Sequence, residues 1–349
     1  MKIAAVLLAF SIARAPYVFT FPRDHAAHFG YQSEGWYYTG HLQAAGGRRF
    51  GYELTFFRFG LRPGEMMLGP HESRWRGSQV YPAHFAITDE KGAVFLHYER
   101  FAREALGFGY ASDRRLEVRV EDWSLLGGDR LKLRAEADGN ALDLQVRSLK
   151  APAIHGIGGV SRKGACASCA SHYYSLTRLQ TTGNLRYAGV RYAVQGISWM
   201  DHEFGSSELQ PDQVGWDWFS LQLDDGREVM LYRLRRRDGT TVPQSSGTVI
   251  DASGRTHYVP VSGFNVDALG RWTSPHTGGQ YPSGWHVTVP SFGIDVIVTP
   301  TLRDQELADA QIGVAYWEGS CVVASAARAQ AATGVAYVEL TGYAGPLGL

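Results

Sequence analysis

The chain has 349 residues, and its 34 Lys and Arg residues balance its 34 Asp and Glu residues, which leaves a formal net charge of zero. This balance gives no sign of the basic surface that a nucleic acid or an anionic membrane requires, so neither is expected as a partner. The length predicts two hydrophobic cores, and the 41 Gly residues, 12% aromatic residues and 19% charged residues are typical of β structure.

The chain begins with a pattern typical of an export signal. Lys2 precedes an apolar run from Ile3 to Ile12, and residues 13–15, Ala-Arg-Ala, have the small-x-small pattern that signal peptidase accepts. The run is too short to stay in a bilayer as an anchor. We therefore predict a signal peptide at residues 1–15, a secreted or periplasmic protein, and no integral membrane segment after its removal. A buried first strand is the alternative interpretation.

A charged stretch, FPRDHAAH, follows at residues 21–28. Arg23 and Asp24 are expected to form an ion-paired plug at the end of a barrel. His25 and His28 are too loosely placed in the sequence to be predicted as metal ligands.

Two segments of the chain resemble each other. Gly35–Arg58 and Gly215–Arg235 each contain a Gly-Trp pair, an aromatic strand, a Gly-containing turn and a returning strand that ends in Arg. This pattern predicts a β-hairpin in each segment, and a repeat at about half the chain length indicates two copies of one β-domain. The aromatic side chains of the two hairpins that we expect to line a ligand site are Trp36, Tyr38, Trp216 and Trp218.

Further short strands are expected in both halves. They cover residues 83–89, 94–100, 116–122, 131–137 and 142–148, and then 247–250, 286–289, 295–299, 313–320 and 336–342. Short strands separated by Gly-containing turns are typical of barrels or sandwiches, and no long helix is predicted. The Gly-, Ser- and Ala-rich stretch 151–170 is expected to cross between the halves or to form a loop over a site. We predict one β-domain at 16–185 and a second at 186–349.

The chain has three cysteines, Cys166, Cys169 and Cys321. The spacing of Cys166 and Cys169 fits half of a zinc site or a redox pair, but the chain has no second CxxC motif. In an oxidising compartment we expect one disulfide, either within this pair or to Cys321.

The stretch Ser171–Ser175, SHYYS, is a candidate for proton transfer. On an extended strand His172 and Tyr174 share one face and Tyr173 lies on the other. His, Tyr and a distant Asp would form a proton-handling set. A surface hairpin with ordinary Tyr packing is the alternative.

The stretch Trp199–Gly205, WMDHEFG, places three ionisable residues in a row. On a strand Trp199, Asp201 and Glu203 share one face while His202 points the other way. One metal ion therefore cannot bind all three side chains without a bulge, and no metal site is predicted.

The acidic residues of this stretch fit acid catalysis better than metal binding. A carboxyl beside Trp199 and near the aromatic strand Trp216–Phe219 lies in an apolar setting, which raises its pKa and allows it to donate a proton. The alternative is that Asp201 and Glu203 are buried acceptors that pair with Arg or with backbone amides.

Several motifs together resemble one family. FPRDHAAH, EGWYYTGHL, ASHYYS, GISWMDHEFG, GWDWFSLQLDDG, YWEGS and YVELTGY occur in the order found in the carotenoid 1,2-hydratase (hydroxyneurosporene synthase) family, which includes AttH-type proteins and predicted secreted hydrolases. The resemblance runs from about Phe21 to Tyr343 and implies two lipocalin-like antiparallel β-barrels in tandem.

The resemblance also implies a chemistry, because hydratases of this family add water across a C=C bond of an acyclic carotenoid without a cofactor. By position, the proposed acid falls on Asp201, with His172, Tyr174 and Trp199 as helpers and Glu203 on the same face as Asp201. A neutral Asp201 would protonate an isoprenoid alkene, Trp199 and Tyr174 would stabilise the cation, and His172 would take a proton from water.

We therefore expect a cofactor-independent enzyme that acts on a hydrophobic small molecule, most concretely a hydratase. A secreted lipocalin-like carrier of an apolar ligand is the first alternative, because aromatic-lined barrels hold such ligands without chemistry. A hydrolase, isomerase or cyclase on the same scaffold is the second.

Overall fold

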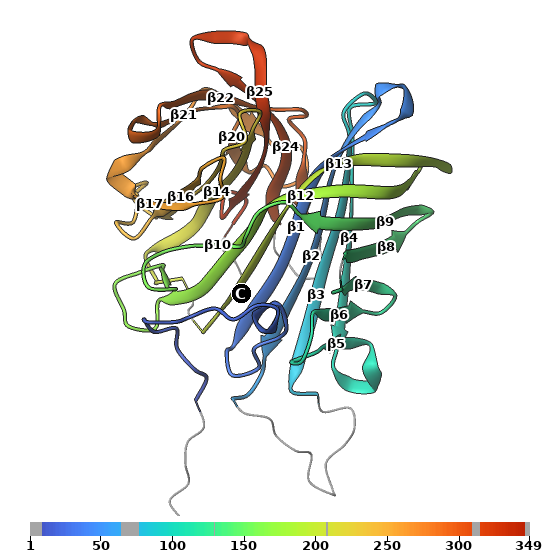
Figure 1. The fold of residues 1–349 in the computed structure, drawn as a ribbon, viewed down its shortest axis with the longest axis vertical. Helices are drawn as coiled ribbons and strands as arrows, with labels where there is room; N and C mark the ends of the chain where they lie inside the picture. Colours follow the sequence, from blue (N-terminus) through green and yellow to red (C-terminus); the bar gives the residue numbers. More distant parts are fainter. Residues whose placement is uncertain (1–8, 64–76, 129, 207–208, 309–314, 346–349) are drawn as a thin grey trace, which may run out of the picture.

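The computed structural model describes residues 9–63, 77–128, 130–206, 209–308 and 315–345. These residues form two large antiparallel sheets that lie side by side, a two-stranded ribbon and short 3-10 turns, without an α-helix (Figure 1). This confirms the all-β prediction. Nowhere in these ranges does a helix have the length and apolar character needed to cross a membrane.

The first sheet has thirteen strands. They are β1 (Ser33–Ala44), β2 (Arg49–Gly60), β3 (Gln79–Asp89), β4 (Val94–Arg103), β5 (Gly109–Ala111), β6 (Glu117–Val120), β7 (Trp123–Leu126), β8 (Leu131–Ala137), β9 (Asn140–Ser148), β10 (Ala153–Ile154), β11 (Ser161–Arg162), β12 (Ala170–Tyr187) and β13 (Val190–Gly205). Their order is β4-β3-β2-β1-β13-β12-β9-β8-β7-β6-β5, with β10 and β11 on β12. The edge strands β4 and β5 contact each other, so the sheet nearly closes into a barrel.

The second sheet has ten strands. They are β14 (Gln213–Leu223), β15 (Glu228–Arg236), β16 (Ser246–Ile250), β17 (Thr256–Pro260), β18 (Asn265–Ala268), β21 (Trp285–Val289), β22 (Ile294–Pro300), β23 (Glu306–Ala308), β24 (Ala315–Ser325) and β25 (Arg328–Thr341). Their order is β17-β16-β15-β14-β25-β24-β22-β21-β18, with β23 on β24, while β19 (Arg271–Thr273) and β20 (Gln280–Pro282) form the ribbon. The 3-10 turns are η1 (Arg23–His25), η2 (Ala45–Gly47), η3 (Ala105–Gly107), η4 (Val261–Gly263) and η5 (Pro290–Phe292).

The two sheets repeat one topology. In each, a four-stranded meander pairs through its first strand, β1 or β14, with the last long strand of the same sheet, β13 or β25. The predicted hairpins are β1–β2 and β14–β15, which agrees with two copies of one domain. Each predicted short strand overlaps a strand of the structure, although residues 313–314 lie outside the described residues. The predicted boundary after residue 185 falls within β12, whereas the sheets divide between Gly205 and Gln213.

Side chains along each strand alternate between the two faces of its sheet. One face of each sheet lines a barrel core, and the other faces the opposite sheet. Side chains such as Trp36 and Leu54 fill the first barrel, and Phe219 and Trp285 fill the second. The opposite faces of the two sheets pack on each other through a third cluster that includes Tyr173, Trp199, Trp218, Tyr232 and Tyr337. Burying each large side chain contributes on the order of 1.5–3 kcal/mol, so all three clusters stabilise the arrangement. We call the region between the facing sheets the interface.

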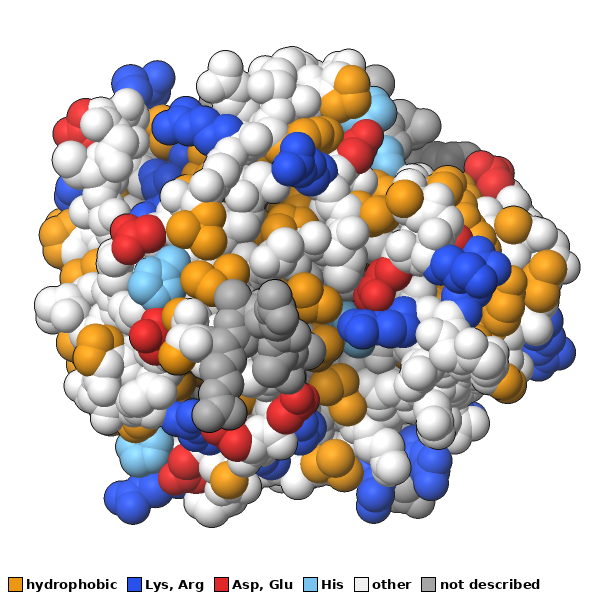
Figure 2. Space-filling view, turned by 90° about the horizontal axis from the view of Figure 1, so that it is seen from above, with side chains coloured by type: hydrophobic (Ala, Val, Ile, Leu, Met, Phe, Trp, Pro, Cys, Tyr) orange, Lys and Arg blue, Asp and Glu red, His pale blue; other side chains and the backbone are white. Residues whose placement is uncertain are grey.

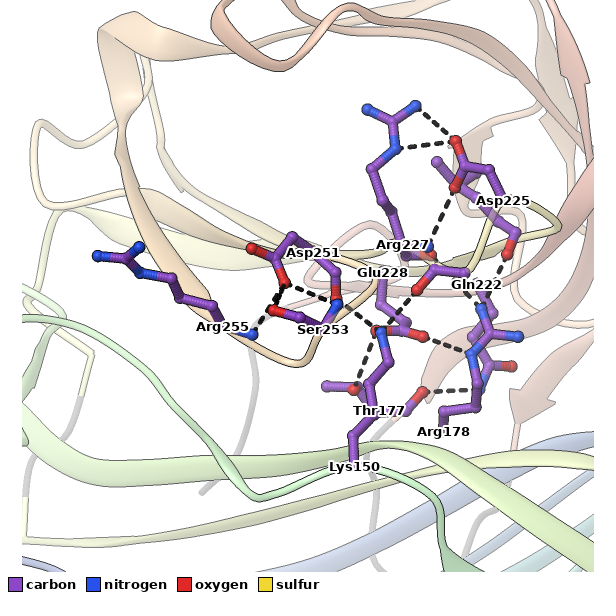
Figure 3. A network of polar contacts seen from close by, with 12 residues as sticks. Lys150, Thr177, Arg178, Gln222, Asp225, Arg227, Glu228, Asp251, Ser253 and Arg255 are labelled. Carbon is purple, nitrogen blue, oxygen red and sulfur yellow. Dashed lines mark hydrogen bonds and ion pairs between the residues drawn. The ribbon is translucent and has the colours of Figure 1, made fainter.

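A buried ion-pair network holds the sheets together (Figure 3). Glu228 on β15 has no exposed surface and accepts hydrogen bonds from Lys150 Nζ at 2.8 Å and from Arg178 Nε on β12. Nearby, Gln222 Nε2 on β14 donates to the backbone oxygen of Thr177 at 2.7 Å. These bonds fix β14 and β15 against β12, and they fix the geometry of the interface.

The N-terminal segment crosses the end of the first barrel (Figure 1). Ser11 N donates to Gly30 O at 2.8 Å, and Ala13 is buried with Val160 and Ala170. Residues 1–8 lie outside the described residues, so cleavage after Ala15 and export stay predictions.

The remaining surface is mixed in character. Figure 2 shows Lys and Arg side chains scattered among Asp and Glu over one face, with hydrophobic side chains between them. In the loop before β12, Cys166 and Cys169 form a disulfide, and Cys321 is a buried free thiol.

Candidate active site

Asp201 lies on β13, points into the interface, and is surrounded by hydrogen-bond donors. Its Oδ1 accepts from Trp199 Nε1 at 2.6 Å and from Ser175 Oγ, and its Oδ2 accepts from the Tyr173 hydroxyl at 2.6 Å. Trp218 of the facing sheet donates Nε1 to the Tyr173 hydroxyl at 2.9 Å. Burial raises the pKa of Asp201 to about 7 in spite of the three donors, so a large share of the molecules carry a proton there near neutral pH.

Ser175 connects Asp201 to a buried histidine. Its Oγ lies 2.6 Å from His155 Nε2, and His155 Nδ1 lies 2.8 Å from Thr248 Oγ1 on β16. Burial lowers the pKa of His155 to about 3, so the ring is neutral. A neutral ring can accept the Ser175 hydroxyl proton, which leaves the Ser175 oxygen able to accept the proton of Asp201. The three groups form a path for a proton.

Glu203 shares the face of Asp201, but it lies at the edge of the interface. Its side chain is 37% exposed, and its Oε1 accepts from Ser171 Oγ and lies 3.0 Å from Lys163 Nζ. Burial acts to lower the pKa of Lys163, but Glu203 and Tyr232 outweigh this effect and raise it. Glu203 is therefore one half of an ion pair, whereas Asp201 makes no ion pair among the described residues.

The facing sheet contributes further acids. Glu318 on β24 and Glu339 on β25 are directly opposite each other in the strand register. The hydroxyl of Tyr37, whose backbone is paired with that of Asp201, donates to Glu318 Oε1 at 2.6 Å. Trp216 Nε1 donates to Glu339 Oε2 at 2.8 Å, and burial raises the pKa of Glu339 to about 8.

Glu53 on β2 completes what we call the glutamate cluster (Glu53, Glu318 and Glu339). Its Oε1 accepts from Thr55 Oγ1 at 2.9 Å and from the hydroxyl of Tyr316, on the facing sheet, at 3.0 Å. Burial raises the pKa of Glu53 to about 7, and burial together with Glu53 and Glu339 raises the pKa of Glu318 well above its usual range. The interface therefore contains several carboxyl groups that hold protons near neutral pH.

Four of the predicted site residues lie on the other side of the first sheet. Trp36 and Tyr38 are in the core of the barrel, and Tyr174 bonds to His202 Nδ1 at 3.1 Å there. His172 is buried at the end of the same barrel, stacked on the N-terminal segment. Because alternate residues of a strand face opposite ways, the structure separates these four from Asp201. It brings Trp199, Glu203, Trp216 and Trp218 to the interface, on the same side of the first sheet as Asp201.

Tyr174 and its neighbours belong to a polar plug at the end of the first barrel. His28 Nδ1 and His202 Nε2 lie 2.8 and 2.9 Å from Glu34 Oε1, and these three ligand atoms lie within 4.8 Å of one another. Such a group could hold a divalent ion. However, Arg58 Nε lies 3.0 Å from Glu34 Oε2, and His28 Nε2 lies 3.2 Å from Asp24.

The charges of this plug are already balanced. Burial acts to lower the pKa of His28, but Asp24 and Glu34 outweigh this effect and raise it, which favours the protonated ring. In that form His28 and Arg58 face the two carboxylates of Asp24 and Glu34. We therefore interpret the group as ion-paired. Asp24 forms an ion pair in this plug, as predicted, but its partner is His28 and not Arg23. His28 lies beside Glu34 and His202, a grouping that the sequence did not indicate.

A cavity of about 590 Å³ lies elsewhere, between residues 12–15, the loop 156–167 and the strands β16 and β17. Its lining contains no carboxyl and no imidazole group. Beside it, the Tyr232 hydroxyl lies 3.0 and 3.2 Å from the backbone oxygens of Arg162 and Gln244, two residues that line the cavity. The interface contains the carboxyl groups of Asp201 and of the glutamate cluster, whose pKa values are raised, so we place the candidate site there.

Sequence reasoning missed several residues of this site. Tyr173 and Ser175 lie in the SHYYS stretch, on the face opposite to His172, and their alternation was a usable signal. His155 lies in a Gly-rich loop, and the three glutamates come from distant strands, so no local pattern identified them.

The comparisons with known proteins assign the family. The chain matches the model of the AttH-like family over residues 12–343. It is similar to the crystal structure of a Nitrosomonas europaea protein named as an AttH, with 30% identity and a TM-score of 0.86 over 96% of this chain and 99% of that chain. It also shares its fold with kievitone hydratase from Nectria haematococca, with 14% identity and a TM-score of 0.68 over 96% of each chain. A search of curated proteins finds no match. The chain belongs to the AttH-like family.

Proposed function

We propose that this protein is an enzyme that adds water across a C=C bond of an apolar small molecule held in the interface, with Asp201 as the acid. The observation that carries the proposal is a buried carboxyl whose pKa is raised to about 7 and which contacts indole and hydroxyl groups. A carboxyl in this state can donate a proton at neutral pH. The resemblance to hydratases and the fold shared with kievitone hydratase support the reaction class.

The proposed reaction needs only the chain's own groups and water. Asp201 transfers its proton to one alkene carbon, and the positive charge develops on the other. Trp199 and Trp218, whose ring centroids lie 6.2 Å apart, and Tyr37 surround this charge with aromatic faces. A water molecule then adds to the cation and gives one proton back to the Asp201 carboxylate, directly or through Ser175.

This geometry revises two of the roles that the resemblance implied. Tyr173 and Ser175 are the β12 side chains that reach Asp201, so Ser175 takes the proton-transfer role expected for His172. Tyr37 and Trp218 take the cation-stabilising role expected for Tyr174. An acyclic isoprenoid, such as a carotenoid, is the most concrete substrate that the resemblance offers. Secretion, which follows from the predicted signal peptide, is part of the proposal.

Mass spectrometry of the products tests this function. The purified protein is incubated with lycopene and neurosporene, and with shorter acyclic terpenes, next to Asp201→Asn and the control Glu203→Gln. Asn keeps the oxygen that accepts from Trp199 and Ser175 but cannot act as an acid, so we expect turnover to fall by roughly 100-fold or more. Glu203→Gln should be much less affected. Equal turnover by Asp201→Asn would refute the mechanism. Ligand recovered unchanged from all three proteins would favour a carrier.

One observation favours a second candidate, an esterase. Ser175 Oγ lies 2.6 Å from His155 Nε2, the spacing of a nucleophile and its base. Hydrolysis of p-nitrophenyl esters that is lost in Ser175→Ala and retained in Asp201→Asn would support this candidate over the hydratase.

A further inference from the structure

Two carboxyl oxygens in the interface have no hydrogen-bond partner. Glu53 and Glu318 are 1% and 0% exposed, and the Oε2 atom of each is buried with no hydrogen-bond partner among the described residues. Buried polar atoms in native proteins almost always have a partner, so two such atoms in one region call for an explanation. A bound molecule would provide one.

Both carboxyls point across the interface toward the opposite sheet. Glu318 belongs to the second sheet, and its Oε1 is bonded by Tyr37 of the first sheet at 2.6 Å. Glu53 belongs to the first sheet, and its Oε1 is bonded by Tyr316 of the second sheet at 3.0 Å. The two unpartnered atoms therefore lie in the region that we assign to the substrate.

Protonation makes these atoms donors. Glu318 stands directly opposite Glu339 in the strand register and near Glu53, and burial together with these neighbours disfavours its ionised form. On both residues a tyrosine hydroxyl donates to Oε1, which leaves Oε2 to carry the proton. A buried O–H group needs an acceptor, and neither Oε2 atom has a hydrogen-bond partner among the described residues.

We propose that Glu53 and Glu318 bind an oxygen function of the substrate, a carbonyl, hydroxyl or ether group, through their Oε2–H groups. Among apolar isoprenoids, the site then favours those that carry an oxygen function over pure hydrocarbons of the same skeleton. This inference rests on the proposed function, because it places the same molecule in the same interface. An amine is the less favoured ligand, since an ammonium group would meet neutral acids.

Quenching of tryptophan fluorescence measures binding in this region, because Trp199, Trp216 and Trp218 surround it. Four probes share one carbon skeleton: β-farnesene, farnesol, farnesal and farnesylamine. Wild type is compared with Glu318→Gln, which keeps an N–H donor, and with Glu318→Leu, which keeps the approximate size but has none. Glu53→Leu gives the same test at the second site if Glu318→Leu does not fold.

We expect wild type to bind farnesal or farnesol roughly tenfold more tightly than farnesene, the factor that one good hydrogen bond supplies. Glu318→Gln should keep this preference, and each Leu variant should reduce it to about threefold or less. A preference that survives both Leu substitutions overturns the proposal. So does tightest binding of farnesylamine that is lost in Glu318→Gln, because that result shows recognition of a cation by a carboxylate.

The same measurements separate this inference from the proposed function. Asp201→Asn should still prefer farnesal, because the preference depends on the glutamates and not on the acid. If Asp201→Asn loses turnover while the Leu variants keep their preference, only this inference fails. If no probe binds to wild type, this inference fails, and turnover of lycopene and neurosporene decides the proposed function by itself.

Discussion

Replacing Glu53 with Gln should remove part of the pH dependence of stability. Burial raises the pKa of Glu53 from 4.5 to about 7. Glu53 therefore ionises at a lower pH in the unfolded chain than in the folded protein. Since one pKa unit corresponds to about 1.4 kcal/mol, the free energy of unfolding should fall by about 3 kcal/mol between pH 4.5 and pH 8. The sign follows from proton binding: the folded state holds the proton longer, so stability falls as pH rises through this window. In Glu53→Gln this loss should be absent.

Urea unfolding followed by tryptophan fluorescence at pH 5, 6, 7 and 8 measures this effect. Gln keeps an Oε1 acceptor for Thr55 and Tyr316, so we expect the variant to be within about 1 kcal/mol of wild type at pH 5 and to gain about 3 kcal/mol relative to it by pH 8. Glu306→Gln, at a buried glutamate of the second barrel, controls for the amide replacement itself. Parallel stability curves for wild type and Glu53→Gln would refute the reasoning.

Three further predictions follow from other charged groups. Turnover should decline as pH rises above about 7, because burial raises the pKa of Asp201 to about 7 and only its protonated form donates; a pH–rate profile that is flat to pH 9 would contradict this. Glu228→Gln should destabilise the protein by roughly 3 kcal/mol in urea unfolding, because two largely buried cations, Lys150 and Arg178, lose the carboxylate that they share. Glu136→Gln, which breaks an exposed ion pair, should cost less than about 1 kcal/mol. A chelator should leave the thermal midpoint unchanged, because Arg58 already neutralises Glu34; a fall in the midpoint that added zinc restores would show a metal at that group.

Local patterns predicted most of the fold. The alternation of apolar and polar residues and the Gly-containing turns identified the hairpins β1–β2 and β14–β15. Each of the other predicted strand ranges overlaps a strand of the structure. These patterns did not predict the length of β12 and β13, which run for 18 and 16 residues. These strands pair with each other along their length and also bond to β9 and β1, and such pairings depend on contacts between distant residues. The division between the sheets therefore lies later than the sequence suggested.

The site was predictable only along a single strand. Alternation placed Trp199, Asp201 and Glu203 on one face and His202 on the other, and the structure agrees. Two of the three partners of Asp201, Tyr173 and Ser175, come from β12, where the register places Ser175 opposite Asp201. No sequence pattern specifies that register, because a shift by one residue exchanges the two faces of a strand.

The alternation of faces also explains why two of the four aromatic side chains expected to line a ligand site, Trp36 and Tyr38, lie in a barrel core. Aligning the Gly-Trp pairs makes Trp36 and Trp216 equivalent, yet Trp36 fills the first barrel and Trp216 faces the interface. The two copies are therefore offset by one residue, so that equivalent tryptophans lie on opposite faces of their sheets. The pairing of β14 with β15 has a register irregularity between Gln213 and Gly215, just before Trp216, and the pairing of β1 with β2 has none. The two copies therefore present different side chains to the shared interface: Tyr37 from the first, and Trp216 and Trp218 from the second. A duplicated hairpin has in this way given one asymmetric site, with the proton path to Asp201 on one wall and two of the three clustered glutamates on the other.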